Sequence, residues 1–335
     1  MAGDGTARTA SAGPDVQSLR VRALTLADVP VVQRLRKQAG WNQSDADWGR
    51  LLAWEPDGCW VGELNGRVVA STTVTTYGTR IAWIGMVLVD EAWRRRGIGR
   101  RMLGHAEAYL AARGVESVAL DATPAGAPLY ASLGYHALHG LERWRGIVAD
   151  IPHPGPEAPS VVEAMSRAPG PAGRTSEDPA SSGPAAGRTA PADVRPMTSA
   201  DLAAVAAYDS RAFGMDRSHI LRALFEGQPA GCVVAERDGS VRDYALGRPG
   251  ARAWHLGPLV ADDGNIAECL ALAALLRHRG EEALMDVVTS NGAAVALAGR
   301  VGLAPVRPFI RMTRGAPPPA PDLRRLYTSA GPEIG

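Results

Sequence analysis

The pattern of apolar and polar positions predicts a mixed series of strands and helices in the first 150 residues. Stretches that alternate, or that are continuously apolar, predict strands, and apolar residues three and four positions apart predict helices. In order along the chain, we predict a strand at 19–24, a helix from Thr25 to Ala39 and a second helix that starts at Ser44. Three strands follow, at 59–64, 67–77 and 81–89, and Asn65-Gly66 forms the hairpin turn between the first two. The series ends with a helix after Gly97, a strand at 115–120, a helix at 126–133 and a strand from Tyr135.

The pattern repeats in the same order after position 194, which predicts an internal duplication at the level of the fold. The second series consists of helices from Thr198 and at 216–225, strands at 231–237, 241–247 and 253–260, a helix at 265–279, a strand at 283–288, a helix at 291–301 and a strand at 305–313 that closes the sheet.

Composition changes sharply between the two series. Positions 151–193 are rich in Pro, Gly, Ala and Ser and have almost no large apolar residues, so they predict a disordered linker. A polar disordered tail is predicted at 1–18 and a C-terminal tail at 315–335, which leaves domains at 19–150 and 194–314. A length of 335 residues agrees with two domains.

Charge and cysteine content exclude several broad classes of protein. The net charge of +1 gives no general attraction to nucleic acid or to a membrane surface. Three widely separated cysteines argue against a disulfide framework and against a zinc site, so we expect no metal. No apolar run approaches the roughly 20 residues of a membrane span, and the first 18 residues lack the apolar core of a signal peptide. We therefore expect a cytoplasmic protein.

The segment from Ile84 to Leu103 carries the strongest functional signal. It has the pattern of a buried strand, a basic turn with glycines at Gly97 and Gly99, and the start of a helix. A helix N-terminus offers unpaired N–H groups and a partial positive charge, and glycines let a bulky anion approach them. The pattern predicts a pyrophosphate site at the end of a central strand.

Two well-known glycine-rich phosphate motifs fit this segment less well. A dinucleotide-binding fingerprint has its glycines directly after the strand, but Gly97 follows Val89 at a distance and Met102 stands where the third glycine belongs. A P-loop requires Gly-Lys-Ser/Thr, which the segment lacks. An ordinary basic turn that caps a helix remains the structural alternative.

Arg94-x-x-Gly97-x-Gly99 after an apolar strand resembles the acyl-CoA site of the GNAT superfamily of N-acyltransferases. The resemblance implies that the loop amides hold the CoA pyrophosphate and that the preceding strand pairs with the pantetheine arm. The positions that match cofactor contacts are Val87, Leu88, Val89, Arg94, Arg95, Arg96, Gly97, Ile98, Gly99 and Arg100.

The same resemblance implies an α/β (α+β) fold with two GNAT-like domains, each a mixed central sheet flanked by helices. The chain resembles bacterial two-domain GNAT proteins that join an active N-terminal domain to a degenerate C-terminal one. In the second half, no Arg-x-x-Gly-x-Gly follows the strand that ends near Val260. We therefore predict no working CoA site there.

Acyl transfer from a thioester to an amine requires an oxyanion stabiliser, an acid for the leaving thiolate and a base for the amine. Backbone N–H groups of Val87–Val89 match the first role. Tyr130, four residues before Gly134-Tyr135, matches the family's general acid. A packing role for Tyr130 is the alternative, and the Asn that often starts its helix is Thr123 in this chain.

The general base is less well defined by the sequence. Many GNAT enzymes use a carboxylate on the fourth strand, but positions 81–89 contain none. Asp121, at the end of the fifth strand, is the nearest candidate, and capping of the following turn is its alternative role. Glu63 and Asp47 are lesser options.

Acceptor contacts are expected from the loop between the first two helices and its surroundings. Polar and aromatic residues occur together there, at Trp41, Asn42, Gln43 and Trp48, and Trp83 lies on the fourth strand. Tryptophans more often fill cores, so packing is the alternative for Trp48 and Trp83.

The sequence therefore predicts an N-acetyltransferase that moves an acetyl group from acetyl-CoA to a primary amine of a small molecule or peptide, by direct attack in a ternary complex. The rival of another class is an acyl-CoA-binding regulatory module without catalysis. Mycothiol synthase also has two GNAT halves, but its working motif is in the second. A terminal carboxylate, as in aminoglycoside-acetylating relatives, would serve as base only if Gly335 reached the site. A homodimer is left open.

Overall fold

The computed structural model describes residues 16–148 and 193–335 and divides into two compact units. Among the described residues, the first unit contains 16–76 and 84–115, and the second contains 77–83, 116–148 and 193–335. The tail predicted at 1–18 and the linker predicted at 151–193 lie almost wholly outside the described residues. Within the described part of the chain, no helix is long and apolar enough to cross a membrane.

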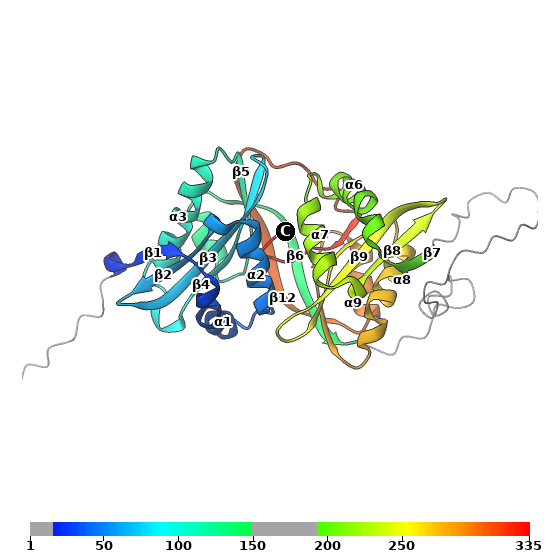
Figure 1. Ribbon diagram of the computed structural model, residues 1–335, viewed down its shortest axis with the longest axis horizontal. Helices are drawn as coiled ribbons and strands as arrows, with labels where there is room; N and C mark the ends of the chain where they lie inside the picture. Colours follow the sequence, from blue (N-terminus) through cyan, green and yellow to red (C-terminus); the bar gives the residue numbers. More distant parts are fainter. Residues whose placement is uncertain (1–15, 149–192) are drawn as a thin grey trace, which may run out of the picture. The chain divides into compact units, whose positions relative to one another are not determined.

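The first unit is a sheet in the order β1-β2-β3-β4 with three helices packed around it (Figure 1). On β2, the Trp60 ring meets His105 and Tyr109 of α3 edge-on at 4.9 and 5.0 Å, which holds this helix to the sheet. The elements are β1 (Arg20–Ala23), α1 (Val29–Gln38), α2 (Asp45–Trp54), β2 (Cys59–Leu64), β3 (Arg67–Tyr77), β4 (Ile81–Val89), which begins in the second unit, and α3 (Ile98–Ala112).

The second unit contains a longer mixed sheet in the order β5-β12-β6-β11-β13-β10-β9-β8-β7. Its main core lies where α8 and α9 cover β10 and β11, with Leu270, Leu297 and Met285 fully buried. The elements are β5 (Ser117–Ala122), α4 (Ala127–Ala131), β6 (His136–Ile147), β7 (Asp193–Pro196), α6 (Leu202–Phe213), α7 (Ser218–Gly227), β8 (Cys232–Arg237), β9 (Ser240–Pro249), β10 (Trp254–Val260), α8 (Gly264–Leu275), β11 (Glu282–Val288), α9 (Gly292–Arg300), β12 (Ala304–Gly315) and β13 (Leu326–Thr328).

The last long strands of the two halves are interleaved. β12, from the second half of the sequence, pairs with β5 and β6 of the first half, and β6 in turn pairs with β11. The prediction that the strand at 305–313 closes the sheet of the second half is therefore wrong, because both strands that pair with β12 come from the first half of the sequence. The mixed α/β class with helix-flanked sheets is confirmed.

Both halves begin with the same arginine-centred arrangement. In each, an arginine on the first strand binds both carboxylate oxygens of an aspartate at 2.8 Å, and the same aspartate accepts hydrogen bonds from the threonine at the helix start. The arginine also donates to a glutamate on the neighbouring strand, at 3.0 and 3.1 Å. The residues are Arg22, Asp28 and Glu63 in the first half and Arg195, Asp201 and Glu236 in the second. The shared geometry supports the predicted duplication.

These two aspartates are expected to make the fold acid-sensitive. Hydrogen bonds from Arg22 lower the pKa of Asp28 to about 2, and those from Arg195 do the same for Asp201. The folded-state pKa lies below the unfolded value, so the stabilisation is present above about pH 4 and is lost as the pH falls towards 2. Asp28→Asn and Asp201→Asn should each lower the unfolding free energy at pH 7 by about 1–2 kcal/mol and flatten its acid dependence. Denaturant unfolding at pH 7 and pH 3 measures this, with exposed Asp57→Asn as control.

Candidate functional site

The turn after β4 presents an uncapped helix N-terminus. Gly97 is the N-cap of α3 with φ +84°, and no side chain caps the helix there. A Cβ at Gly97 would meet nothing within 4 Å, so the space beside Gly97 is open. Arg95 also has a left-handed backbone, with φ +61°, which is rare for a residue with a side chain. Such alternating backbone makes an anion-binding concavity from main-chain N–H groups.

Three exposed arginines, Arg94, Arg95 and Arg96, lie in the loop directly before this N-terminus, and the loop is anchored at its base. Arg94 donates to the Val89 carbonyl at 3.1 Å, and the Arg96 guanidinium lies 4.9 Å from the Trp93 ring centre. Asp90 accepts from the Ala92 N–H and pairs with Arg34 of α1. The arrangement suits a phosphate group, because exposed arginines adjoin a helix N-terminus whose N–H groups no side chain caps. Among the predicted cofactor contacts, Ile98 is buried, and Arg100 is exposed.

A left-handed backbone position precedes the residues that the sequence assigns to the pantetheine arm. Met86 has φ +50°, and Ser71 of β3 donates its hydroxyl hydrogen to the Met86 carbonyl at 2.8 Å. Val87, Leu88 and Val89 follow this position, with Leu88 buried and the other two half-buried. The irregular backbone at Met86 was not predicted from the sequence, although Gly85 within a continuous apolar strand is a signal for an irregularity.

Tyr130 lies in the short helix α4 and packs on the small core formed by Leu120, Tyr135 and Met312. Its ring meets the Tyr135 ring edge-on at 6.0 Å. Burial raises the pKa of Tyr130 to about 12. The phenol therefore keeps its proton at neutral pH. At the start of α4, the Thr123 carbonyl accepts from the N–H groups of Gly126 and Ala127, which places Thr123 as a local turn residue.

Asp121 lies on β5 and is held by Arg311 of β12. Both carboxylate oxygens accept hydrogen bonds from the guanidinium at 2.8 Å, and the two side chains are 2% and 5% exposed. Burial raises the pKa of Asp121, and the charge of Arg311 opposes the rise. Arg311 also lies over the Trp83 ring, 4.5 Å from its centre. This partner, 190 positions away, was not predicted from the sequence.

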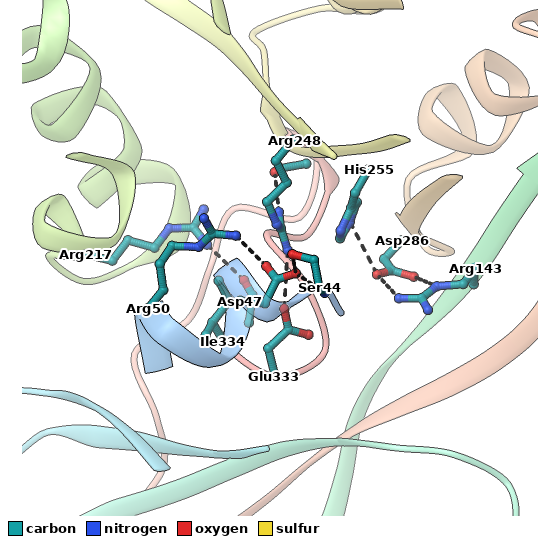
Figure 2. Close-up of polar contacts among 12 residues, drawn as sticks. Ser44, Asp47, Arg50, Arg143, Arg217, Arg248, His255, Asp286, Glu333 and Ile334 are labelled. Atoms are coloured by element: carbon teal, nitrogen blue, oxygen red, sulfur yellow. Dashed lines mark hydrogen bonds and ion pairs between the residues drawn. The ribbon is translucent and has the colours of Figure 1, made fainter. Parts of the chain in front are cut away.

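The two lesser base candidates are also paired. Asp47 closes a capping box at the start of α2 by accepting from the Ser44 N–H and hydroxyl at 2.7 and 2.9 Å, and it accepts from Arg50 at 2.6 Å (Figure 2). Glu63 pairs with Arg22 at 3.0 Å. Both carboxylates thus have local structural roles in the first unit.

The predicted acceptor loop is fixed to α1 by its backbone. Arg36 donates to the Trp41 carbonyl at 3.0 Å, and Gln33 donates to the Gln43 carbonyl at 3.3 Å. Trp41 is half-buried, and Asn42 and Gln43 are 6% and 5% exposed. The loop is therefore ordered and mostly covered rather than freely exposed.

Trp48 and Trp83 are buried. Trp48 has no exposed surface, and its indole N–H has no hydrogen-bond partner among the described residues. Trp83 is 2% exposed, and a Cβ at Gly335 would come within 3.0 Å of its ring. Gly335 is itself buried, and its carbonyl accepts from Arg217 at 2.9 Å. The C-terminal segment therefore packs directly on Trp83.

A second buried polar cluster, in the second unit, was not predicted from the sequence. Arg143 donates to both oxygens of Asp286 at 2.8 and 2.7 Å, and His255 points to the same carboxylate with its Nε2 3.6 Å away (Figure 2). Burial, together with nearby arginines, holds the pKa of His255 well below its usual value, so the ring is neutral. Arg248 pairs with Glu333 at 3.3 Å. Within residues 16–148 and 193–335, no group of acidic, His and Cys side chains is arranged to hold a metal ion.

Comparisons with solved structures agree with this fold. A putative acetyltransferase from Pyrococcus horikoshii superposes with a TM-score of 0.70 at 20% identity, covering 95% of this chain and 96% of the other. A tandem GNAT protein from the clavulanic acid biosynthesis pathway superposes with a TM-score of 0.58 at 16% identity, covering 90% and 99%.

Two curated relatives are similar over most of their length. The chain is 23% identical to the uncharacterized N-acetyltransferase YitH of Bacillus subtilis over 234 residues, 70% of each protein. It is also 23% identical to a holothin acyltransferase of a Pseudoalteromonas species over 297 residues, 88% of this chain and 87% of the relative.

Two family models match the two halves of the chain. The acetyltransferase (GNAT) family model matches residues 29–135, and an acetyltransferase (GNAT) domain model matches residues 205–328. Together they span most of the sequence and agree with the duplicated arrangement at the start of each half. The chain therefore belongs to the GNAT acetyltransferase family and contains two GNAT domains.

Proposed function

We propose that the chain is an acetyl-CoA-dependent N-acetyltransferase with one cofactor site, at the end of β4. The observation that carries this proposal is the uncapped N-terminus of α3, with Gly97 at its start and Arg94, Arg95 and Arg96 exposed beside it. The pyrophosphate would accept from the α3 amides, with Gly99 and Arg100 in the first turn. The pantetheine arm would pair with the backbone of Val87–Val89.

The chemistry we propose is direct attack of a deprotonated primary amine on the thioester carbonyl carbon. The new C–N bond gives a tetrahedral oxyanion, which a backbone N–H of β4 after Met86, the residue with φ +50°, stabilises. The C–S bond then breaks, and Tyr130 gives its proton to the leaving thiolate. A phenol of pKa about 12 is fully protonated before the reaction, as this role requires.

Asp121 is the general base in this proposal. Burial raises the pKa of Asp121 and makes its carboxylate a better proton acceptor than an exposed aspartate, but both its oxygens already accept from Arg311. That pairing is the observation that favours the second candidate function, an acyl-CoA-binding regulatory module without turnover.

The acceptor we propose is the primary amine of a small molecule or peptide. Half-buried Trp41 would contact it at the surface of the loop, and Asn42 and Gln43, which are buried as Trp48 and Trp83 are, would contact it only from beneath that surface. A relative named as a holothin acyltransferase favours a small-molecule acceptor. The free thiols of all three cysteines agree with the expected cytoplasmic location.

Calorimetric titration of the full chain with acetyl-CoA tests the cofactor site. One site per chain is expected, and replacing Arg94, Arg95 and Arg96 together by Ala should weaken binding by at least about tenfold. Arg113→Ala, which removes an arginine at the other end of α3, is the matched control and should bind as the unmodified chain does. Two sites would contradict the single-site proposal, and no binding at millimolar ligand would reject both candidate functions.

A second assay separates the two candidate functions. Free-thiol release from acetyl-CoA is followed with a panel of primary amines and amino-terminal peptides. Amine-dependent release supports the enzyme, whereas tight binding without release across the panel supports the regulatory module.

A further inference from the structure

Strand β10 is the counterpart, in the second half, of the strand that we assign to acetyl-CoA in the first. β4 pairs with β5 in parallel at Ala82 and Trp83, and β10 pairs with β11 in parallel at Trp254 and His255. Aligning Trp83 with His255 also aligns two further pairs at identical spacing, Gly85 with Gly257 and Asp90 with Asp262. The same backbone position is irregular in both strands, at Met86 in β4 and between Leu256 and Leu259 in β10.

The C-terminal strand β13 lies between β10 and β11 beyond the point where those two strands pair. Thr328 is opposite Leu259 of β10 on one side and Val287 of β11 on the other, and Leu326 is opposite Val260. In the alignment, Leu259 and Val260 correspond to Val87 and Leu88. In the second domain, the backbone of β13 therefore lies beside the residues of β10 that correspond to Val87 and Leu88. In the first domain, the proposed function gives that place to the pantetheine arm.

β13 is buried and hydrogen-bonded to the same degree as a strand inside a sheet. Leu326, Tyr327 and Thr328 are 4%, 2% and 1% exposed. Hydrogen bonds hold the backbone at both ends, because the Ala261 N–H donates to the Arg325 carbonyl at 3.0 Å and the Ser329 N–H donates to the Asp286 carbonyl at 2.9 Å. The Asn291 side chain adds a bond to the Leu326 carbonyl at 3.2 Å.

The phosphate end of the corresponding site is also occupied by the chain itself. The N-cap of α8 is Asp263, whose carboxylate accepts from the N–H groups of Asn265 and Ile266, both at 3.0 Å. Asp263 follows Asp262 directly, whereas Gly97, the N-cap of α3, comes seven positions after Asp90. The loop with the arginines is therefore missing, and a fixed negative charge stands where an anion would bind.

We propose that the second GNAT domain carries a built-in occupant of its acyl-CoA cleft. The strand Leu326–Thr328 replaces the pantetheine arm between β10 and β11, and the Asp263 carboxylate replaces the pyrophosphate at the N-terminus of α8. The comparison with the first domain rests on the proposed function. The C-terminal segment is then a structural part of the second domain and is not exchanged for cofactor during turnover.

Hydrogen–deuterium exchange of the full chain, with and without acetyl-CoA, tests this proposal. We expect the amides of Leu326–Thr328 to exchange slowly before any ligand is added and to stay unchanged when acetyl-CoA is present. The amides of Val87–Val89 should instead slow on addition of acetyl-CoA. Exchange at open-chain rates over Leu326–Thr328, or a change there of more than about tenfold with acetyl-CoA, would overturn the proposal.

The two readouts separate failure of this proposal from failure of the proposed function. If Val87–Val89 do not respond to acetyl-CoA, the cofactor site in the first domain is wrong, while slow exchange at Leu326–Thr328 still supports the built-in occupant. If Leu326–Thr328 respond to acetyl-CoA, the occupant is displaced by cofactor and the second domain binds it.

A matched pair of substitutions at one position tests whether the backbone of β13 is what matters. Thr328→Pro removes an N–H within a strand that has partners on both sides, and it should speed exchange across 326–328 and 259–260. Thr328→Val is the control, because the buried Thr328 hydroxyl has no partner among the described residues and valine has nearly the same shape. Equal exchange in the two variants would contradict the backbone role. If Thr328→Pro does not fold, the exchange of Leu326–Thr328 in the unmodified chain, with and without acetyl-CoA, still tests the proposal.

Discussion

Tyr130→Phe is expected to lower the turnover number by roughly 10²-fold, while the affinity for acetyl-CoA stays within about twofold of the unmodified chain. The substitution removes only the hydroxyl, and the ring continues to pack on Tyr135 and Met312. The lost step is protonation of the leaving thiolate. The pKa of the half-buried Tyr130 phenol is raised to about 12, so the phenol holds its proton at neutral pH.

Amine-dependent thiol release and calorimetry, measured on the same preparation, check this expectation. Tyr109→Phe is the matched control, because the Tyr109 phenol donates to Glu55 at 2.7 Å in the first unit and has no proposed role in proton transfer. We expect that control to lose stability but not turnover. A Tyr130→Phe variant that turns over at the unmodified rate removes Tyr130 from the mechanism.

The bounds of several strands and the start of α3 were predictable, because nearby residues alone determine them. The apolar runs at 59–64, 67–77 and 81–89 match β2, β3 and β4 residue for residue, since Asn65-Gly66 and Gly78 turn the chain sharply between them. The start of α3 was also predictable, because a glycine followed by a periodic apolar stripe specifies a helix start without reference to the rest of the chain.

Strand neighbours were not predictable in the same way. Alternation along β12 fixes which side chains face the core, but the same alternation fits any partner strand of suitable length. The pairing of β12 with β5 and β6 is settled by contacts such as Ser117 with Thr313, 3.0 Å apart between hydroxyl oxygens and 196 positions apart in sequence. The strand Leu326–Thr328 is too short to show any period, and only its place between β10 and β11 reveals it.

The partner of Asp121 illustrates the same limit for the candidate site. The position of Asp121 at the end of a strand was visible in the sequence, but its bidentate bond to Arg311 depends on the interleaved strand β12. Asp121 was chosen as the candidate base from its place on β5, but its ion pair with Arg311 gives it a structural role as well. Separating the role as a base from the role in the ion pair requires variants that change the charge pairing and keep the fold.

Asp121→Asn is expected to lower the free energy of unfolding by about 3–5 kcal/mol, because it leaves the Arg311 guanidinium buried without a counter-ion. Replacing both partners, as Asp121→Leu with Arg311→Met, should recover most of that loss, since two apolar side chains of similar size carry no unpaired charge and the methionine still packs on Trp83. Denaturant unfolding of the two single variants and the double variant measures the coupling between them.

The double variant also decides whether Asp121 is the general base. If Asp121 accepts the amine proton, the double variant folds and binds acetyl-CoA, but it loses turnover together with the acidic limb of the pH–rate profile, which in the unmodified chain reports protonation of this carboxylate. If the pair is only structural, the double variant keeps both the rate and the acidic limb, and the proton leaves the amine by another route. Testing turnover in Asp121→Asn alone would not make this distinction, since partial unfolding lowers the rate in either case.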